Sequence, residues 1–81
     1  ETFEDQAALV WENIIAQLHA AGMDVENLVK VTTYLSDRKF SGANSAARQH
    51  VLGNHAPALT IIIAGIFDKT WLLEIEAIAE A

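Results

Sequence analysis

Apolar side chains recur every three or four residues from Thr2 to Ala21, which is the period of one face of an α-helix. The positions are Phe3, Ala7, Val10, Ile14, Leu18 and Ala21. Thr2 is a suitable N-cap because Asp5 follows three residues later, and Gly22 is suited to the left-handed residue that closes a helix. The pattern therefore predicts a first helix from Thr2 to Ala21.

The next pattern is that of a strand. β-Branched and aromatic residues predominate from Leu28 to Leu35, as they do in half-buried strands. Alternation places one set of side chains on one face, namely Val29, Val31, Thr33 and Leu35. It places the other set on the opposite face, namely Leu28, Lys30, Thr32 and Tyr34. Helical spacing then returns from about Lys39 to Leu52, and Gly53 ends this second, less apolar helix.

Two further strands complete the chain. The segment from Leu59 to Ile66 is apolar on both faces and is predicted to be buried. Pro57 cannot donate to a strand ladder and should lie at the start of this strand, while Gly65 indicates a bulge or a close backbone approach. The segment from Trp71 to Ala79 alternates, with one face formed by Leu72, Glu74, Glu76 and Ile78. The order helix, strand, helix, strand, strand predicts a single α+β domain over residues 1–81.

Length and composition indicate that the chain associates with other subunits. A domain of 81 residues buries only about 60 to 65% of its unfolded surface when it stands alone. Yet 52% of the residues are hydrophobic and the mean hydropathy is +0.21. We therefore expect part of the apolar surface to face another subunit.

Charge and residue usage exclude several classes of function. The net charge is -6 and there are only five Lys and Arg residues, which argues against nucleic acid as a partner because basic side chains supply most of the affinity for phosphate. The absence of cysteine rules out a disulfide framework. No apolar run approaches the roughly 18 residues of a membrane-spanning helix, so we expect a soluble, cytoplasmic protein without membrane contact. The sequence opens at Glu1 without a methionine, and we expect a preceding segment to be missing.

Few residues suggest chemistry by type and spacing alone. Glu74 and Glu76 share a strand face, and such a pair can divide into an acid and a base when one carboxylate is buried, although a solvated strand face is the commoner arrangement. Asn44 is an unusual residue inside a helix and either points toward a pocket or, more commonly, is exposed. We predict no metal site and no cofactor, since no ligand spacing links His19, His50 and His55. Trp11 and Trp71 are predicted to be core or interface aromatics.

Several motifs resemble those of one protein family. ALVWENIIAQLHAAGMDVENLVKVTTYLSD is followed by F-x-x-x-N, by P-A-x-T and by a terminal EIEAIA. Together they resemble the YjgF/RidA family, also called the endoribonuclease L-PSP family, over nearly the whole chain. The resemblance implies a fold similar to that of Bacillus chorismate mutase, with two helices packed on one face of a mixed β-sheet and a homotrimer with ligand pockets between subunits.

Family members also have strands ahead of the first helix, and this chain lacks them. The resemblance therefore implies an N-terminally incomplete chain. In the family fold the last strand lies between one of those front strands and the strand matching Leu28 to Leu35. We accordingly expect one edge of Trp71 to Ala79 to lack its neighbour.

The resemblance also implies candidate site residues. Asn44 matches the pocket asparagine of the family, and the backbone of Ile61 lies where main-chain groups contact the ligand. Glu74 matches the pocket glutamate, which holds or activates the attacking water. Leu59 stands where members that hydrolyse imines have an arginine that binds the substrate carboxylate. Leucine cannot provide this bidentate contact, whose loss typically costs about 1.5 to 3 kcal/mol.

Two functions of different classes follow from these matches. The first is a trimeric protein that binds a small molecule in pockets between subunits without the arginine-dependent imino-acid deaminase activity. The alternative is a hydrolase similar to the 2-iminobutanoate and enamine deaminases that acts on a neutral or cationic amine-derived substrate. A ribonuclease activity fits poorly with five basic residues and no histidine pair placed for acid and base catalysis.

Overall fold

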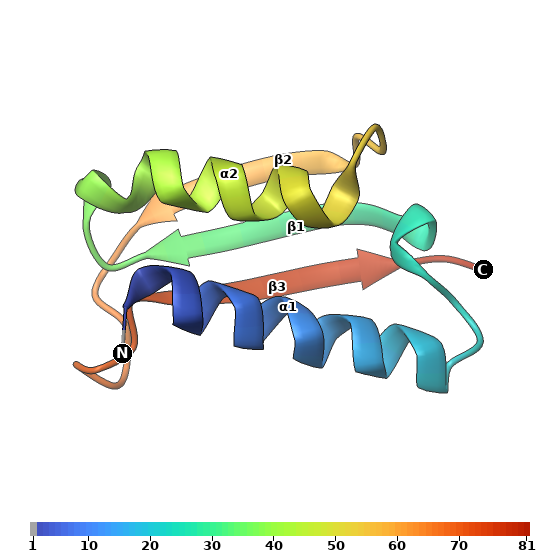
Figure 1. Ribbon diagram of the computed structural model, residues 1–81, viewed down its shortest axis with the longest axis horizontal. Helices are drawn as coiled ribbons and strands as arrows, with labels where there is room; N and C mark the ends of the chain where they lie inside the picture. The colour runs from blue at the N-terminus through green and yellow to red at the C-terminus, as the bar shows by residue number, and fades with distance from the viewer. Residues whose placement is uncertain (1) are drawn as a thin grey trace.

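A computed structural model describes residues 2–81 as two helices and three strands, which Figure 1 shows in sequence colours. The elements are α1 (Phe3–Ala20), β1 (Leu28–Leu35), α2 (Ser41–Leu52), β2 (Ala58–Ile63) and β3 (Leu73–Ala79). Short 3-10 turns, Val25–Asn27 and Arg38–Phe40, precede β1 and α2. The predicted order of elements is confirmed. The second helix begins two residues later than predicted, the strand β2 ends at Ile63 instead of Ile66, and β3 begins at Leu73 instead of Trp71.

The three strands form one mixed sheet in the order β2-β1-β3. β1 pairs with β2 in parallel and with β3 in antiparallel orientation. Both helices lie on the same face of this sheet, running alongside the strands (Figure 1). The predicted α+β class, with two helices on one face of a mixed sheet, is therefore confirmed. Within the described residues, β2 and β3 each have one edge without a neighbouring strand.

Local hydrogen bonds define both ends of α1. The Thr2 hydroxyl oxygen accepts a hydrogen bond from the backbone N–H of Asp5 at 3.1 Å, so Thr2 is the N-cap as predicted. At the other end Gly22 has φ of 75°, and the N–H of Met23 donates to the carbonyl of Leu18 at 2.8 Å. This is a Schellman motif, in which glycine accepts the left-handed conformation at little cost.

The predicted faces of β1 are wrong at its first two residues. β1 contains a bulge between Leu28 and Lys30. These two residues are two positions apart in β1, yet they pair with Ala79 and Ile78, which are adjacent in β3. The extra residue, Val29, is 43% exposed, whereas Leu28 is 2% exposed and joins the core under the helices. A bulge shifts the alternation by one position, which a simple period of two cannot predict.

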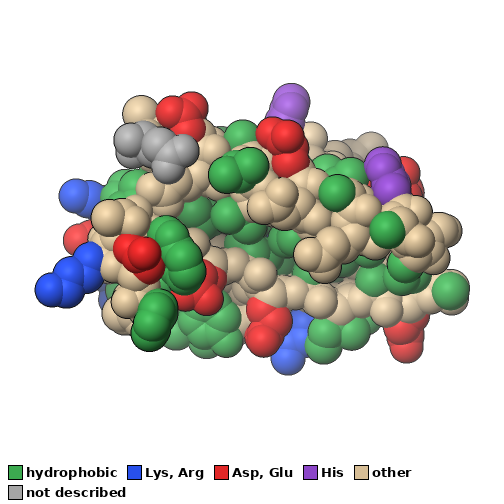
Figure 2. Space-filling view, turned by 90° about the horizontal axis from the view of Figure 1, so that it is seen from below, with side chains coloured by type: hydrophobic (Ala, Val, Ile, Leu, Met, Phe, Trp, Pro, Cys, Tyr) green, Lys and Arg blue, Asp and Glu red, His purple; other side chains and the backbone are tan. Residues whose placement is uncertain are grey.

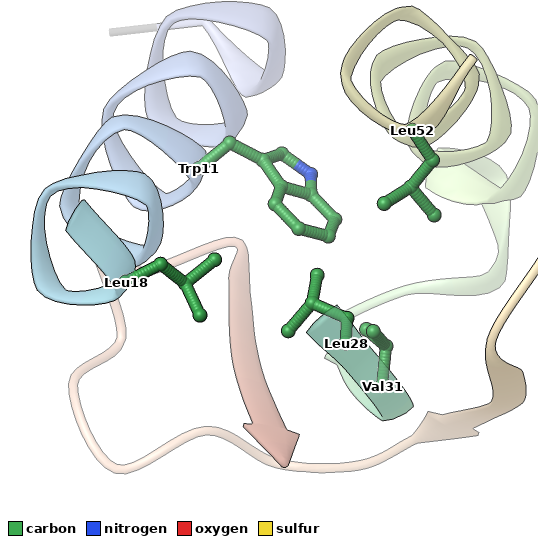
Figure 3. Packing of buried hydrophobic residues seen from close by; sticks show 5 residues of the cluster. All are labelled: Trp11, Leu18, Leu28, Val31 and Leu52. Carbon is green, nitrogen blue, oxygen red and sulfur yellow. The ribbon is translucent and has the colours of Figure 1, made fainter. Parts of the chain in front are cut away.

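Two apolar clusters fill the space between the helices and the sheet. The first, drawn in Figure 3, connects α1, β1 and α2 and consists of Trp11, Leu18, Leu28, Val31 and Leu52. The second lies near the start of α1 and consists of Phe3, Ala7, Leu35 and Leu73. Trp11 is 2% exposed, so its predicted place in the core is confirmed.

The prediction that the apolar strand after Pro57 is buried is wrong for the single chain. Every residue of β2 is exposed, including Leu59, Ile61 and Ile63, whose exposed fractions are 44%, 42% and 41%. The physical reason is the position of β2 at the edge of the sheet, where only one strand borders it. Neither core cluster contains a residue of β2. Gly65 follows the strand and lies in no bulge, but Pro57 directly precedes the strand as predicted.

Two hydrogen bonds of the Gln6 side chain connect the loop between β2 and β3 to α1. The Gln6 side chain donates to the carbonyl of Thr70 at 3.0 Å and accepts from the N–H of Leu72 at 2.8 Å. Within the loop, hydrogen bonds from the hydroxyl and then from the backbone N–H of Thr70 hold the pKa of Asp68 below its usual value. Trp71 is 46% exposed in this loop and therefore lies outside the core.

Candidate functional site

The face of the sheet opposite the helices carries most of the polar side chains of the strands. We call it the outer sheet face, and its members are Lys30, Thr32, Tyr34, Thr60, Ile62, Glu74, Glu76 and Ile78. Their common orientation follows from the pairing register, since paired residues on neighbouring strands project to the same side. Glu74 and Glu76 are thus on one face, as the alternation of β3 predicts.

Both carboxylates of the outer sheet face are exposed in the single chain. Glu74 lies opposite Tyr34, and Glu76 lies opposite Thr32. Side chains in such pairs are typically about 4.5 to 5.5 Å apart at Cβ, so a phenol and a carboxylate are neighbours here. Neither carboxylate is buried, so the single chain does not provide the unequal environments that would divide the pair into an acid and a base.

Tyr34 is a candidate site residue that sequence reasoning missed. It is half-buried in the central strand, between Ile62 of β2 and Glu74 of β3. The sequence does place Tyr34 on the polar face of β1, but only the pairing of β1 with β3 brings it opposite Glu74. A phenol at this place can donate a hydrogen bond to a carboxylate or to a bound molecule.

Leu59 and Ile61 lie on the other face of the sheet. Leu59 pairs with Val31 and Ile61 with Thr33, and both partners are buried on the helix side. Glu74 projects from the outer face and belongs to the strand beyond β1, which places its backbone roughly 10 Å from that of β2. Within one chain, therefore, the side chain of Leu59 and the carboxylate of Glu74 do not face a common space.

Asn44 is buried in α2 and is not the exposed residue that is common in helices. It is 1% exposed, and its Nδ2 atom has no hydrogen-bond partner. A buried amide donor without a partner is rare and costly, so its retention requires a specific reason. Side-chain amides of this kind are suited to bind a carbonyl or carboxylate oxygen.

Residues 2–81 form at least two grooves. One, of about 370 Å³, lies between α1 and β3 and is lined by Val10, Asn13, Ile14, Gln17, Leu18, Met23, Leu28, Ile75, Ala77 and Ala79. Figure 2 views this side, where apolar side chains gather in the recess between helix and sheet. The other, of about 510 Å³, lies between α1 and α2. Neither groove is lined by any of the four predicted site residues Asn44, Leu59, Ile61 and Glu74.

Across residues 2–81, no three His, Asp or Glu side chains are grouped closely enough to hold a metal ion. Two of the three histidines have other contacts: Nε2 of His55 is 2.8 Å from the Leu28 carbonyl, and Nε2 of His19 is 3.5 Å from Oδ1 of Asp24. In the same part of the chain, neither helix combines the length and the apolar character that crossing a bilayer requires.

Comparison with known proteins identifies relatives over the whole chain. The family profile described as Endoribonuclease L-PSP matches residues 1–81. The chain is 37% identical over 76 residues to a RutC family protein of Pyrococcus horikoshii and 35% identical over 81 residues to the mitochondrial protein mmf2 of Schizosaccharomyces pombe. It is 34% identical over 79 residues to TdcF of Escherichia coli, named as a candidate reactive intermediate deaminase. These matches cover 94%, 96% and 94% of this chain but only 60%, 64% and 61% of the three relatives.

Solved structures agree with the fold. A candidate endoribonuclease L-PSP from Entamoeba histolytica superposes with a TM-score of 0.94 at 33% identity, covering 100% of this chain and 65% of that one. A candidate endoribonuclease from Thermotoga maritima gives a TM-score of 0.92 at 29% identity, covering 98% of this chain and 62% of that one. The arrangement of two helices on a mixed sheet is thus shared over the full length of the present chain.

Proposed function

Because this chain belongs to the endoribonuclease L-PSP family, which is the YjgF/RidA family, we propose that it is a RidA-like protein that binds a small molecule in pockets between the subunits of a homotrimer. In this proposal Asn44, Leu59 and the backbone of Ile61 contact the ligand, and Glu74 presents its carboxylate to it. Leu59 stands where the family resemblance places the carboxylate-binding arginine. The proposed function therefore excludes the arginine-dependent imino-acid deaminase activity. A cytoplasmic location stays a prediction.

The exposure of β2 is the observation that carries the proposal. Leu59, Ile61 and Ile62 are 44%, 42% and 38% exposed in the single chain, although strands with this composition are normally covered. Apolar surface of this kind is typical of contacts between subunits. A pocket formed where another subunit meets β2 would contain Leu59 and Ile61, which explains why neither groove of the single chain includes them.

The ligand can be sought directly in the purified protein. Native mass spectrometry should give a trimer whose mass exceeds that of three chains, and denaturation should release a small molecule. A neutral or cationic molecule is expected, because Leu59 offers no positive charge and the chain carries a net charge of -6. A trimer that releases only anionic imino acids would contradict the proposal.

The alternative is a hydrolase that acts on a neutral or cationic imine or enamine. The exposed carboxylate of Glu74 favours it, because this group can accept a proton from an attacking water once a substrate excludes solvent. The relative TdcF carries a deaminase name, which agrees with this class of reaction. Turnover of uncharged imines at a rate above that of the Glu74→Gln variant would favour the alternative over simple binding.

We expect the protein to be a compact homotrimer in solution. The cause is the apolar surface of β2, which a single subunit leaves exposed. Light scattering coupled to size exclusion at micromolar concentration measures the mass directly. A mass equal to that of one chain would contradict this prediction and would remove the pocket between subunits with it.

We expect Glu74→Gln to weaken ligand binding and Glu76→Gln to change it little. A hydrogen bond to a charged group contributes about 1.5 to 3 kcal/mol, so its loss should weaken binding roughly ten- to hundredfold. Calorimetry with the molecule that copurifies provides the measurement. Glu76 is the matched control, since it lies on the same face of the same strand. Equal losses in both variants would show that the carboxylates act only through their common negative charge.

A further inference from the structure

A second groove lies between the two helices, away from the outer sheet face. This interhelical groove has a volume of about 510 Å³ and is lined by Glu4, Ala8, Trp11, Glu12, Ile15, Ala43, Ala46, Ala47, His50 and Val51. Its size is within the range of small-molecule sites. Alanines account for four of the ten lining residues, so the helix surfaces leave space that longer side chains would occupy.

The floor of the interhelical groove contains a hydrogen-bond donor without a partner. Trp11 is 2% exposed, and its Nε1 atom is buried and makes no hydrogen bond. In Figure 3 this nitrogen is on the edge of the indole ring that is turned away from the strands and toward the space between the helices. Indole is a donor only, and a buried tryptophan usually has an acceptor for this group. An occupant of the groove with an acceptor oxygen would supply it.

The rim of the interhelical groove is acidic. Glu4 and Glu12 are eight residues apart in α1, so with Ala8 they follow one face of the helix. No lysine or arginine lines the groove, and His50 is the only other ionisable residue there. The net charge of the chain is -6, which adds to the attraction of this rim for a cation.

We propose that the interhelical groove binds a small amphipathic amine, whose acceptor oxygen takes the hydrogen bond of Trp11 Nε1. The apolar body of the molecule lies against Ala8 and Ala47, and its ammonium group lies beside Glu12. This site uses none of the residues of the pocket between subunits, so it goes beyond the function proposed above. The groove itself is open in the single chain and requires no second subunit, whereas Trp11 Nε1 is buried, so the acceptor reaches it only when a neighbouring side chain moves aside.

The test uses para-methoxyphenethylamine, which combines an ether oxygen, an aromatic ring and an ammonium group. Proton–nitrogen correlation NMR spectra of the labelled protein contain two indole signals, and a Trp71→Phe variant assigns them to Trp11 and Trp71. Titration should move the Trp11 indole signal to lower field, as expected when an N–H gains an acceptor, and should leave the Trp71 signal in place. Shifts confined to other residues, with the Trp11 indole unchanged, would overturn the proposal.

Matched probes separate the contribution of the hydrogen bond to the binding affinity from the contribution of the charge. The para-ethyl analogue keeps shape and charge but has no acceptor, and it should bind roughly three- to tenfold more weakly. In Trp11→Phe, followed by backbone amide shifts, the two amines should bind alike because the donor is gone. A difference between them that persists in Trp11→Phe would assign the ether oxygen to another partner and overturn the assignment.

The carboxylate rim provides an independent test that leaves the core intact. Glu12→Gln should weaken the binding of the methoxy amine roughly two- to fivefold, as expected for an exposed ion pair. Glu26→Gln, which removes an exposed carboxylate outside the groove, should not. The anionic analogue para-methoxyphenylpropionate should bind more weakly than the amine. Equal affinity for the anion, or equal effects of the two Gln variants, would overturn the proposed ligand class.

Discussion

Replacing Trp11 with alanine is expected to cost about 3 to 5 kcal/mol of folding free energy. Trp11 is 2% exposed and packs with Leu18 of α1, Leu28 and Val31 of β1 and Leu52 of α2, so its loss opens a cavity at the meeting point of three elements. A domain of this length typically has a total stability of about 4 to 12 kcal/mol. The variant should therefore lose a large share of its stability, and urea unfolding followed by circular dichroism measures the loss.

Two other variants serve as controls for the loss of stability expected in Trp11→Ala. Trp71→Ala removes the same side chain from a place that is 46% exposed, and it should cost less than about 1 kcal/mol. Trp11→Phe keeps an aromatic ring in the core and removes the unpaired indole donor, so it should retain most of the stability. Comparable losses in Trp11→Ala and Trp71→Ala would contradict the central role of Trp11 in the core.

The helices were predictable because their signals are local. The spacing of Phe3, Ala7 and Leu18 indicates which face of α1 is buried, and all three side chains are buried in the structure. Thr2 and Gly22 mark the helix ends through contacts within a few residues of themselves. Such contacts do not depend on the rest of the fold, so a single sequence is sufficient to predict them.

The environment of a strand depends on its neighbours, which a single sequence does not specify. β2 has the composition of a buried central strand but forms an edge of the sheet in the single chain. The apolar pattern predicts that something covers the strand, but it does not specify whether the cover is a helix or another subunit. Val29 illustrates the same limit, since the bulge that exposes it depends on pairing with β3.

The sequence proposes residues for the candidate site but does not give their geometry. Motif resemblance selects Asn44, Leu59, Ile61 and Glu74, and the burial of Asn44 without a partner for Nδ2 independently marks it as unusual. Only the register of the sheet places Leu59 and Glu74 on opposite faces. The same register brings Tyr34 opposite Glu74, a pairing that no local pattern in either strand encodes.

The Leu59→Arg variant is expected to gain hydrolysis of an imine derived from an amino acid. Leu59 is 44% exposed in the single chain, so the fold of the chain itself leaves room for an arginine there. Its guanidinium would bind the substrate carboxylate through two parallel hydrogen bonds, which leucine cannot form. A contact of this strength should raise kcat/KM roughly ten- to hundredfold. The assay generates the imine in solution and follows the release of ammonia and the keto acid.

Two controls decide whether the gain comes from the intended contact. Leu59→Lys supplies the charge without the planar fork, so it should recover only part of the activity of Leu59→Arg. Adding Glu74→Gln to Leu59→Arg should abolish the gain, because the carboxylate would no longer activate the water. If a trimeric Leu59→Arg protein shows no gain, Leu59 is not a sufficient cause of the absence of activity that we propose. The cause would then lie in other residues near the proposed pocket, with Asn44 and Tyr34 as the first candidates.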